Sequence, residues 1–527
     1  MTSIVSHRAP DGSARSLRRV TTMLWVVATL LYVLTASGWI QTIDVVQSIA
    51  VATQFVDHGG RLWVDGLHSV GVHQTWVGPG GGIQPGVNHH FYVAHAFGEA
   101  LVMVPGAVLR HLGVISDIKM QFVDSLVNPI AAGTLVTVAF RIMHRLSGRL
   151  RSSLVGALLI GFASMVWPYA HFSFDATPTA LFLMLALLGI LGLAEEPTRR
   201  RSFAVGAALA AALAFRVDSA LMVTVDVAWL LWTLRSLPMA DRIKNAACAA
   251  VPLALIVVVT ALYNVTRFGG IFDDGHRLDT SVQHTFPLLR GVADLLISPG
   301  RGILLFSPLL VVAAIGVPWL FRKAPGLVVS QGLGILAVVL FVATLTNFSG
   351  FAAWGPRFLV PVLPIALLPI IGVLVRWRDL HLAIRTISVV CIVASAVIQI
   401  VAVCLPVVYF DYFTEFLEKP MSIEAWHGGG QLWRALHQAG ENLTSLNHLL
   451  TLKYIGVFTI PDFWWASTQS TMAAHRGGDL LVAGVLAVVL AVVARKLWLA
   501  VALEKGTSEP ATLPDAAVPH WPRSSSH

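Results

Sequence analysis

One carboxylate stands where the first long apolar run of the sequence ends. The run covers residues 22–37, and Asp44 follows it closely, so its carboxyl is expected beside a membrane surface. After Asp44, apolar residues such as Val45, Ile49 and Ala52 recur at the three-to-four spacing of a helix with one apolar face. Such a helix should lie along the membrane plane. A carboxylate held there can act as a general base on a substrate carried by a membrane lipid.

Further polar residues gather at the outer ends of the apolar runs. They are Asp175, Arg216, Arg267, Arg301 and Arg357, together with His89, His90 and His95 of the first loop. The guanidinium of arginine binds phosphate at two points and keeps its charge at any working pH. Gly-rich turns such as residues 298–302 let backbone amides approach an anion. The pattern predicts phosphate chemistry at the membrane surface.

Each of these residues also has an ordinary structural interpretation. Asp44 could cap its surface helix, and Asp175 could cap the apolar run that begins at Pro178, because Asp is a favoured N-cap. Arg301 and Arg357 could reach lipid head groups from the ends of their runs. The histidines lack a firm metal-ligand spacing, which favours ordinary loop histidines over a zinc site.

Composition places the whole chain in a membrane. Of its 527 residues, 56% are hydrophobic and 12% are charged, whereas soluble domains carry roughly 25% charged residues. The net charge of +8 could suggest a nucleic-acid partner, but the basic residues fall in short clusters between apolar runs, as in inner membrane loops. Cys248, Cys391 and Cys404 all lie in apolar runs, so neither a disulfide framework nor a zinc spacing is present.

Apolar runs and basic clusters together predict an all-α integral membrane protein with about twelve transmembrane helices. The spans with predicted bounds cover residues 22–40, 122–143, 153–170, 178–194, 203–215, 246–263, 327–346, 386–405 and 479–494, and three more end before Arg235, Arg322 and Arg376. The stretch 96–112 is also apolar, but Glu99 and Pro105 interrupt it. A crossing there would put every later basic cluster outside, so a surface or re-entrant helix is expected.

The same assignment divides the chain. It gives a cytoplasmic basic arm at 1–21, a transmembrane domain at 22–405 with an extracytoplasmic first loop at 41–120, an extracytoplasmic segment at 406–478, a last transmembrane helix at 479–498 and a cytoplasmic tail at 499–527. The tail is rich in Ser and Pro and is expected to be disordered. The long outer loops place the working surface on the extracytoplasmic face.

Several short motifs, taken in order, resemble the type-C (GT-C) glycosyltransferases. These polytopic enzymes use polyprenyl-phosphate or dolichyl-phosphate sugars and include protein mannosyltransferases and lipid A aminoarabinose transferases. The matching stretches are the acid after the first span, then residues 88–105, 172–178, 263–270, 296–308 and 355–364. The last three blocks resemble an uncharacterised bacterial branch, and the resemblance extends over residues 20–380.

The resemblance implies a GT-C-like fold and an inverting transfer of a sugar from a polyprenyl-phosphate donor. Asp44 and Asp175 become the candidate catalytic residues, Arg301, Arg357, Arg216 and Arg267 the candidate contacts of the donor phosphate, and His89, His90 and His95 the candidate contacts of the sugar or acceptor. The acceptor would be an extracytoplasmic envelope glycan, glycolipid or protein. The enzyme would lie in a bacterial cytoplasmic membrane.

The sequence departs from the family pattern at two places. Ala94 stands where a basic residue is expected, and the second loop offers one acid instead of a pair. The need for a divalent cation, Mg²⁺ or Mn²⁺, therefore stays open.

Two other functions fit parts of the sequence. Asp226 lies inside an apolar run, and an acid within the membrane is typical of transporters, which favours a flippase for a lipid-linked sugar. Transporters usually contain paired repeats, and the two halves of this sequence show none. In a non-catalytic assembly subunit, by contrast, the outer acid and arginines would be dispensable.

Overall fold

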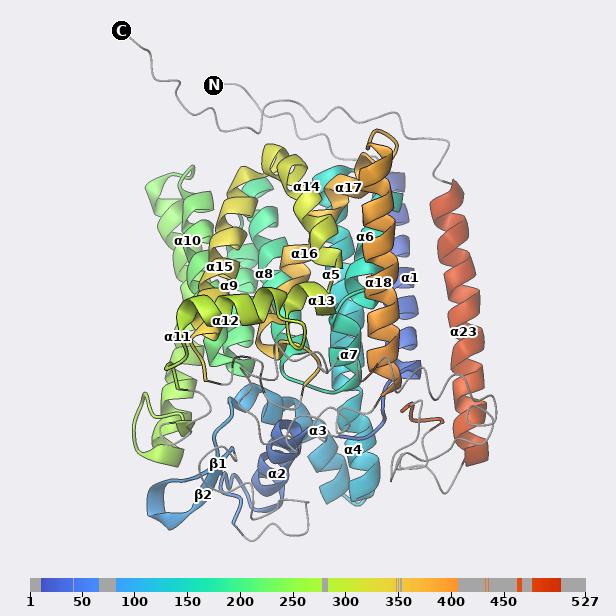
Figure 1. Ribbon diagram of the computed structural model, residues 1–527. Helices are drawn as coiled ribbons and strands as arrows, with labels where there is room; N and C mark the ends of the chain where they lie inside the picture. The colour runs from blue at the N-terminus through green and yellow to red at the C-terminus, as the bar shows by residue number, and fades with distance from the viewer. Residues whose placement is uncertain are drawn as a thin grey trace.

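The fold separates into a bundle of apolar helices and a smaller layer across one end of that bundle (Figure 1). It is described here from a computed structural model. The structure describes residues 11–40, 42–65, 82–276, 283–346, 348, 350, 353–405, 432, 435, 462–466 and 476–503. Most of segment 406–478 and the tail from residue 504 onward, for which the sequence made predictions, therefore lie outside the described residues.

The helices of the bundle follow the apolar runs of the sequence. They are α1 (Asp11–Leu34), α5 (Val127–Ser147), α6 (Leu150–Phe162), α7 (Val166–His171), α8 (Ala176–Glu195), α9 (Arg199–Phe215), α10 (Ala220–Leu234), α11 (Met239–Phe268), α14 (Leu309–Lys323), α15 (Pro325–Ala343), α16 (Leu363–Leu367), α17 (Ile370–Val375), α18 (Leu382–Cys404) and α23 (Arg476–Leu503). Two short helices, α12 (Leu288–Ile297) and α13 (Ile303–Phe306), run across its side (Figure 1).

Every predicted span coincides with helical structure. Within the described residues, eight helical segments are long and apolar enough to cross a membrane: 15–34, 117–147, 176–195, 217–234, 239–268, 325–343, 382–404 and 478–502. The remaining predicted spans fall on shorter helices. One of these is divided into α16 and α17 at Pro369, which lacks the amide donor that a continuous helix needs. The chain is thus an all-α polytopic membrane protein.

The layer beyond the bundle consists of α2 (Ile43–Asp57), α3 (Phe97–His111), α4 (Asp117–Ser125) and a hairpin of β1 (Ile83–Pro85) and β2 (Phe91–Val93). The strands are antiparallel, and Gln84 pairs with Tyr92. The turn between them is the 3-10 helix η3 (Val87–His89). Stretch 96–112 forms α3 in this layer, outside the bundle, as expected for a surface helix (Figure 1).

The apolar face of α2 packs against protein, and the orientation of this helix along the membrane plane stays a prediction. Val45 and Ile49 are 0% and 3% exposed and pack with Met103 of α3 and Met120 of α4. The face is covered by protein because α3 crosses it and α4 follows α3. This packing fixes the helix that carries Asp44 to the rest of the layer.

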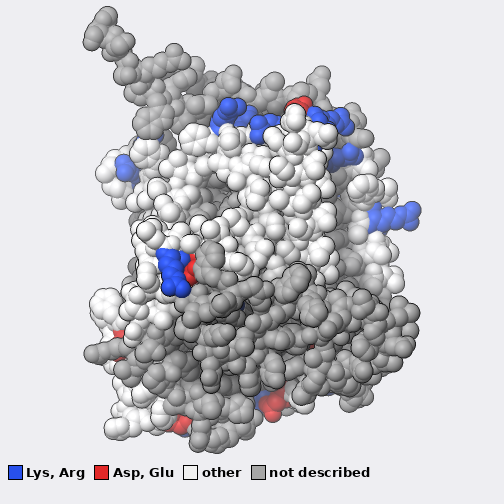
Figure 2. Space-filling view, in the orientation of Figure 1, with Lys and Arg blue, Asp and Glu red and all other residues white. Residues whose placement is uncertain are grey.

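Basic side chains gather at the end of the bundle farthest from the α2–α4 layer (Figure 2). Arg322 and Lys323, for example, form the last turn of α14 at the α14–α15 connection. Basic residues mark the cytoplasmic side of membrane proteins. The distribution therefore predicts that the α2–α4 layer faces outward.

Cysteine labelling tests this orientation. Lys119, in α4, and Pro197, between α8 and α9, are both exposed and lie at opposite ends of the structure. In intact cells, Lys119→Cys should react with a membrane-impermeant maleimide and Pro197→Cys should not. The parent chain supplies the background of its three native cysteines. Labelling of Pro197→Cys alone would reverse the orientation.

Candidate functional site

A cavity of about 1080 Å³ lies where the α2–α4 layer meets the bundle. Its polar lining includes Asp44, His95, Glu99, Asp175, Arg216, Asp218 and Arg357. The bundle helices add apolar side chains, among them Leu213 of α9, Leu221 of α10 and Phe341 of α15. The cavity therefore places charged groups next to an apolar wall that is continuous with the membrane-spanning helices.

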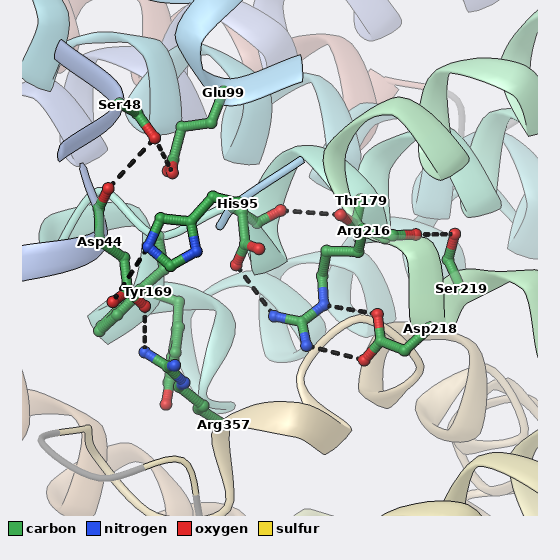
Figure 3. Close-up of polar contacts among 12 residues, drawn as sticks. Asp44, Ser48, His95, Glu99, Tyr169, Thr179, Arg216, Asp218, Ser219 and Arg357 are labelled. Carbon is green, nitrogen blue, oxygen red and sulfur yellow. Dashed lines mark hydrogen bonds and ion pairs between the residues drawn. The ribbon is translucent and has the colours of Figure 1, made fainter. Parts of the chain in front are cut away.

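Asp44 forms an ion pair with Arg357 in this cavity (Figure 3). Nη1 of Arg357 donates to Oδ2 of Asp44 at 2.7 Å, and the two side chains are 17% and 31% exposed. Arg357 begins the 3-10 helix η7 (Arg357–Leu359), whereas Asp44 lies in the first turn of α2. The N-cap of α2 is Thr42, so Asp44 does not cap this helix.

Asp175 takes part in a second cluster, which Arg216 organises. Asp175 occupies the N-cap position of α8, but its side chain makes no capping hydrogen bond. Its Oδ1 accepts from Nη1 of Arg216 at 3.0 Å. Nε and Nη2 of Arg216 donate to both carboxylate oxygens of Asp218, at 3.0 and 2.7 Å. Arg216 is thus held by two carboxylates at the start of the 3-10 helix η4 (Val217–Ser219).

Arg216 and Arg357 differ in how many hydrogen-bond donors they still offer to a ligand. All three nitrogen atoms of the Arg216 guanidinium already donate to carboxylates. Arg357 donates to one carboxylate through Nη1, and its Nε is buried without a protein partner. The Phe358 ring lies between the two guanidinium groups, 5.2 Å from that of Arg216 and 5.3 Å from that of Arg357. Arg357 is therefore the better placed of the two for an anionic ligand.

The other two predicted phosphate contacts hold backbone segments in place. Arg301 is buried, is not among the residues that line the cavity, and donates through Nη1 to the carbonyl of Ala353 at 2.9 Å. Arg267 does line the cavity, but its guanidinium donates to the carbonyls of Val93 and His95 and to Asn264. The hydrogen bond of Arg301 thus holds the segment that leads to Arg357 in place. Those of Arg267 hold the segment that ends in His95.

The three predicted histidines do not lie in one place. His95 lines the cavity, and its Nε2 lies 3.7 Å from Oδ1 of Asp44. His89 and His90 are not among the lining residues. His90 stacks on Trp63, with ring centroids 4.4 Å apart, and its Nδ1 lies 2.5 Å from Oδ2 of Asp65. The structure therefore brings only His95 of the three to the cavity.

Glu99 is a cavity residue that the sequence analysis did not select. It lies in the first turn of α3, where Gly98 approaches the backbone of Ala214 so closely that a Cβ would be 2.5 Å from the carbonyl oxygen. This contact brings α3 against the end of α9, near Arg216. Asp218 was also missed as a site residue. An acid within the otherwise apolar stretch 96–112 was the available signal for Glu99, but it served only to exclude a membrane crossing.

Neighbouring charges decide the pKa shift of Asp44, whereas burial decides that of His95. Burial raises the pKa of Asp44, but the charges of Arg357 and His95 and the Arg357 hydrogen bond outweigh it, and the pKa falls to about 2. Burial lowers the pKa of His95, and this effect exceeds the opposite effect of the Asp44 charge. At neutral pH the cavity therefore holds an Asp44 carboxylate beside a neutral imidazole.

Burial favours the protonated form of Glu99. Burial, together with the charges of Asp175 and Asp44, raises the pKa of Glu99 well above its ordinary value of 4.5. Oγ of Ser48 lies 3.0 Å from Oε2 of Glu99 and 3.1 Å from the carbonyl of Asp44. The hydroxyl has one proton to donate, so a protonated Glu99 can donate to Ser48 while Ser48 donates to the carbonyl.

Two further expectations concern a metal and Asp226. In the part of the chain that the structure describes, no group of three or more His, Cys, Asp or Glu side chains could hold a metal ion. The role of a divalent cation stays a prediction, and no step below uses one. Asp226 of α10 is not in the cavity lining, and its Oδ1 accepts from Nε2 of Gln331 in α15 at 2.7 Å. This acid links two membrane helices.

Comparison with known proteins finds similarity among solved structures. The sequence matches no known family model and no curated protein. Among solved structures, the chain is similar to ArnT from Cupriavidus metallidurans bound to undecaprenyl phosphate, with a TM-score of 0.44, 14% identity, and coverage of 94% of this chain and 75% of ArnT. The apo state of the same ArnT gives a TM-score of 0.43, 15% identity and coverage of 93% and 74%.

A neutral Glu99 should leave a signature in the pH dependence of stability. The folded chain keeps the Glu99 proton at pH values where the unfolded chain has lost it, so this residue lowers stability as pH rises above its ordinary pKa of 4.5. Glu99→Gln cannot ionise. The fall in melting temperature between about pH 5 and pH 8 should therefore be smaller in Glu99→Gln than in the wild type.

Glu195 supplies a matched control, because its side chain is 65% exposed and pairs with Arg145 far from the cavity. Glu195→Gln should keep the wild-type pH dependence. Identical pH dependence in wild type and Glu99→Gln would show that Glu99 is ionised in the folded protein.

Proposed function

We propose that the chain is an inverting glycosyltransferase that moves a sugar from a polyprenyl-phosphate donor to a hydroxyl acceptor on the extracytoplasmic face of a bacterial cytoplasmic membrane. The acceptor class is an envelope glycan, a glycolipid or a protein. The observation that carries the proposal is the cavity itself. It joins the Asp44–Arg357 ion pair to an apolar wall of bundle side chains.

A polyprenyl-phosphate sugar matches both parts of this cavity. Its apolar chain would lie along Leu213, Leu221 and Phe341, which are as apolar as the membrane lipid around the donor. Its phosphate would meet Arg357, whose Nε is buried without a protein partner. A guanidinium can offer such an anion two parallel N–H donors. The lipid would therefore present the bond between sugar and phosphate beside Asp44.

The transfer would be a single displacement. The acceptor oxygen forms a bond to the anomeric carbon of the sugar, and the bond between that carbon and the phosphate oxygen breaks. The acceptor proton passes to Asp44, and polyprenyl phosphate leaves with the bonding electron pair. One displacement inverts the anomeric centre, since no enzyme nucleophile takes part.

The ion pair links proton transfer to departure of the phosphate. As long as Arg357 pairs with Asp44 alone, the Asp44 pKa of about 2 makes this carboxylate a weak base. A bound phosphate would share the charge of Arg357 and so raise the Asp44 pKa. When Asp44 takes the proton it loses its charge, and Arg357 is then free to stabilise the charge that develops on the phosphate.

The remaining lining groups suit substrate placement. The neutral imidazole of His95 and the carboxylic acid of Glu99 can hydrogen-bond sugar or acceptor hydroxyls without adding charge. Asp175 lines the same cavity and accepts from Arg216 through Oδ1, so its second oxygen can also accept from a substrate hydroxyl. A flippase has less support, because Asp226 bonds to Gln331 outside the cavity.

Replacement of Asp44 tests the proposed base. Asp44→Asn keeps the shape of the side chain and its bond from Arg357 but cannot accept the proton. Turnover of a polyprenyl-phosphate sugar should fall by about 10²–10⁴-fold, the usual loss for a missing general base. The melting temperature should change little, because Asn can still accept from the guanidinium.

Asp57 offers a matched control on the same helix. It also pairs with an arginine, Arg110, and with His111, but it is not among the cavity residues. Asp57→Asn should retain near-normal turnover. Near-normal turnover in Asp44→Asn itself would remove Asp44 as the base.

A further inference from the structure

A short segment near the C-terminal end of the chain docks on the end of the first helix. In residues 462–466, the amide of Trp464 donates to the carbonyl of Ala36 at 3.0 Å, and its indole Nε1 donates to Val33 at 2.8 Å. Nε1 of Trp465 donates to the carbonyl of Leu34 at 2.7 Å. The last carbonyls of a helix have no partner within it, so this segment supplies donors to the end of α1.

Asp462 of the same segment meets His171, the last residue of α7, in a buried ion pair. The side chains are 3% and 0% exposed, and Oδ2 of Asp462 lies 3.3 Å from Nε2 of His171. Nδ1 of His171 lies 2.6 Å from the carbonyl oxygen of Thr35, which can only accept, so Nδ1 carries a proton. Nε1 of Trp39 completes the cluster by donating to Oδ1 of Asp462 at 3.2 Å.

This cluster joins the two segments that carry the candidate catalytic acids. Oγ of Ser37 lies 2.8 Å from the carbonyl of Trp39 and 3.3 Å from that of His171. Asp44 follows the first segment and Asp175 follows the second. The position of Asp44 relative to Asp175 therefore depends on a set of contacts that includes Asp462.

The backbone at Gly38 leaves room for Trp464. Gly38 has φ +74°, a left-handed conformation that favours glycine, and a Cβ on it would lie 2.3 Å from Cβ of Trp464. The Phe122 ring meets Trp464 edge to face, with centroids 5.7 Å apart. The positive φ of Gly38 and its lack of a side chain therefore allow Trp464 to pack against the backbone here.

We propose that Asp462 and His171 are positioning residues of the transfer reaction: their buried pair locks segment 462–466 against the segments that lead to Asp44 and Asp175 and so sets the spacing of the two acids. The proposal rests on the function proposed above. Neither residue lines the cavity.

A contribution to stability alone does not account for this pair. Removing two charges from water costs free energy that their attraction often fails to return, so buried ion pairs are a poor source of stability and a better source of defined geometry. In an active site, a shift of about 1 Å can lower the rate about a hundredfold. The effect of losing the pair should therefore appear in turnover before it appears in donor affinity.

Asp462→Asn tests the proposal, because it removes the charge and keeps the shape. We expect kcat to fall about ten- to a hundredfold, the donor KM to change less than twofold, and amide hydrogen exchange to rise together in segments 36–40 and 171–175. Tyr32→Phe is the matched control: it removes a buried hydrogen bond, 2.8 Å long, from α1 to the carbonyl of Gly161, away from the acids. It should lower the melting temperature and leave kcat and exchange in both segments near wild type.

The proposal is overturned if Asp462→Asn behaves like Tyr32→Phe, with a lower melting temperature but unchanged kcat and unchanged exchange in both segments. If Asp462→Asn does not fold, Trp39→Phe removes the indole donor to Asp462 and must show the same pattern in weaker form. Hydrogen exchange does not require catalysis. A wild-type chain that transfers no sugar would therefore refute the proposed function, while exchange would still decide whether Asp462 couples the two segments.

Discussion

The site depends on one interaction, the ion pair of Asp44 and Arg357 at the edge of a membrane-embedded bundle. Its partners are 313 positions apart in sequence and are joined at 2.7 Å. A half-buried charge is costly without a partner, so the α2–α4 layer and the loop before η7 must hold the pair together. The packing of α2 on α3 and α4, and the fastening of the loop by Arg301, serve this purpose. The cavity beside the pair then becomes a place where an anion can compete with Asp44 for Arg357.

Arginines in this structure perform two tasks that composition alone does not separate. Arg357 and Arg216 present their charge to the cavity, while Arg301 and Arg267 donate to backbone carbonyls. The difference follows from surroundings. The nearest acceptors of Arg301 and Arg267 include backbone carbonyls, whereas those of Arg216 and Arg357 are carboxylates. Tyr169 acts with Arg301, since its hydroxyl donates to the carbonyl of Trp354 at 3.0 Å.

Sequence patterns predicted the bundle well because apolar length and basic clusters are local features that the membrane imposes. They also selected Asp44, Asp175, Arg216, Arg267, Arg357 and His95, which line the cavity and whose roles stay predictions. They failed where the answer depends on long-range packing. The apolar face of α2 could not reveal whether lipid or α3 covers it. Glu99 was recognised as a break in an apolar stretch, but its place in the site follows from the approach of α3 to α9 at Gly98.

The central claim is that Asp44 and a lipid phosphate compete for Arg357. Binding of undecaprenyl phosphate to purified wild-type, Arg357→Gln and Asp44→Asn chains tests it most directly. The account predicts that Arg357→Gln weakens binding about ten- to a hundredfold, the loss of one charged hydrogen-bond partner. It also predicts that Asp44→Asn binds at least as tightly as the wild type, because Arg357 is released from its carboxylate. Unchanged binding in Arg357→Gln, or binding in Asp44→Asn that is weakened as much as in Arg357→Gln, would contradict it.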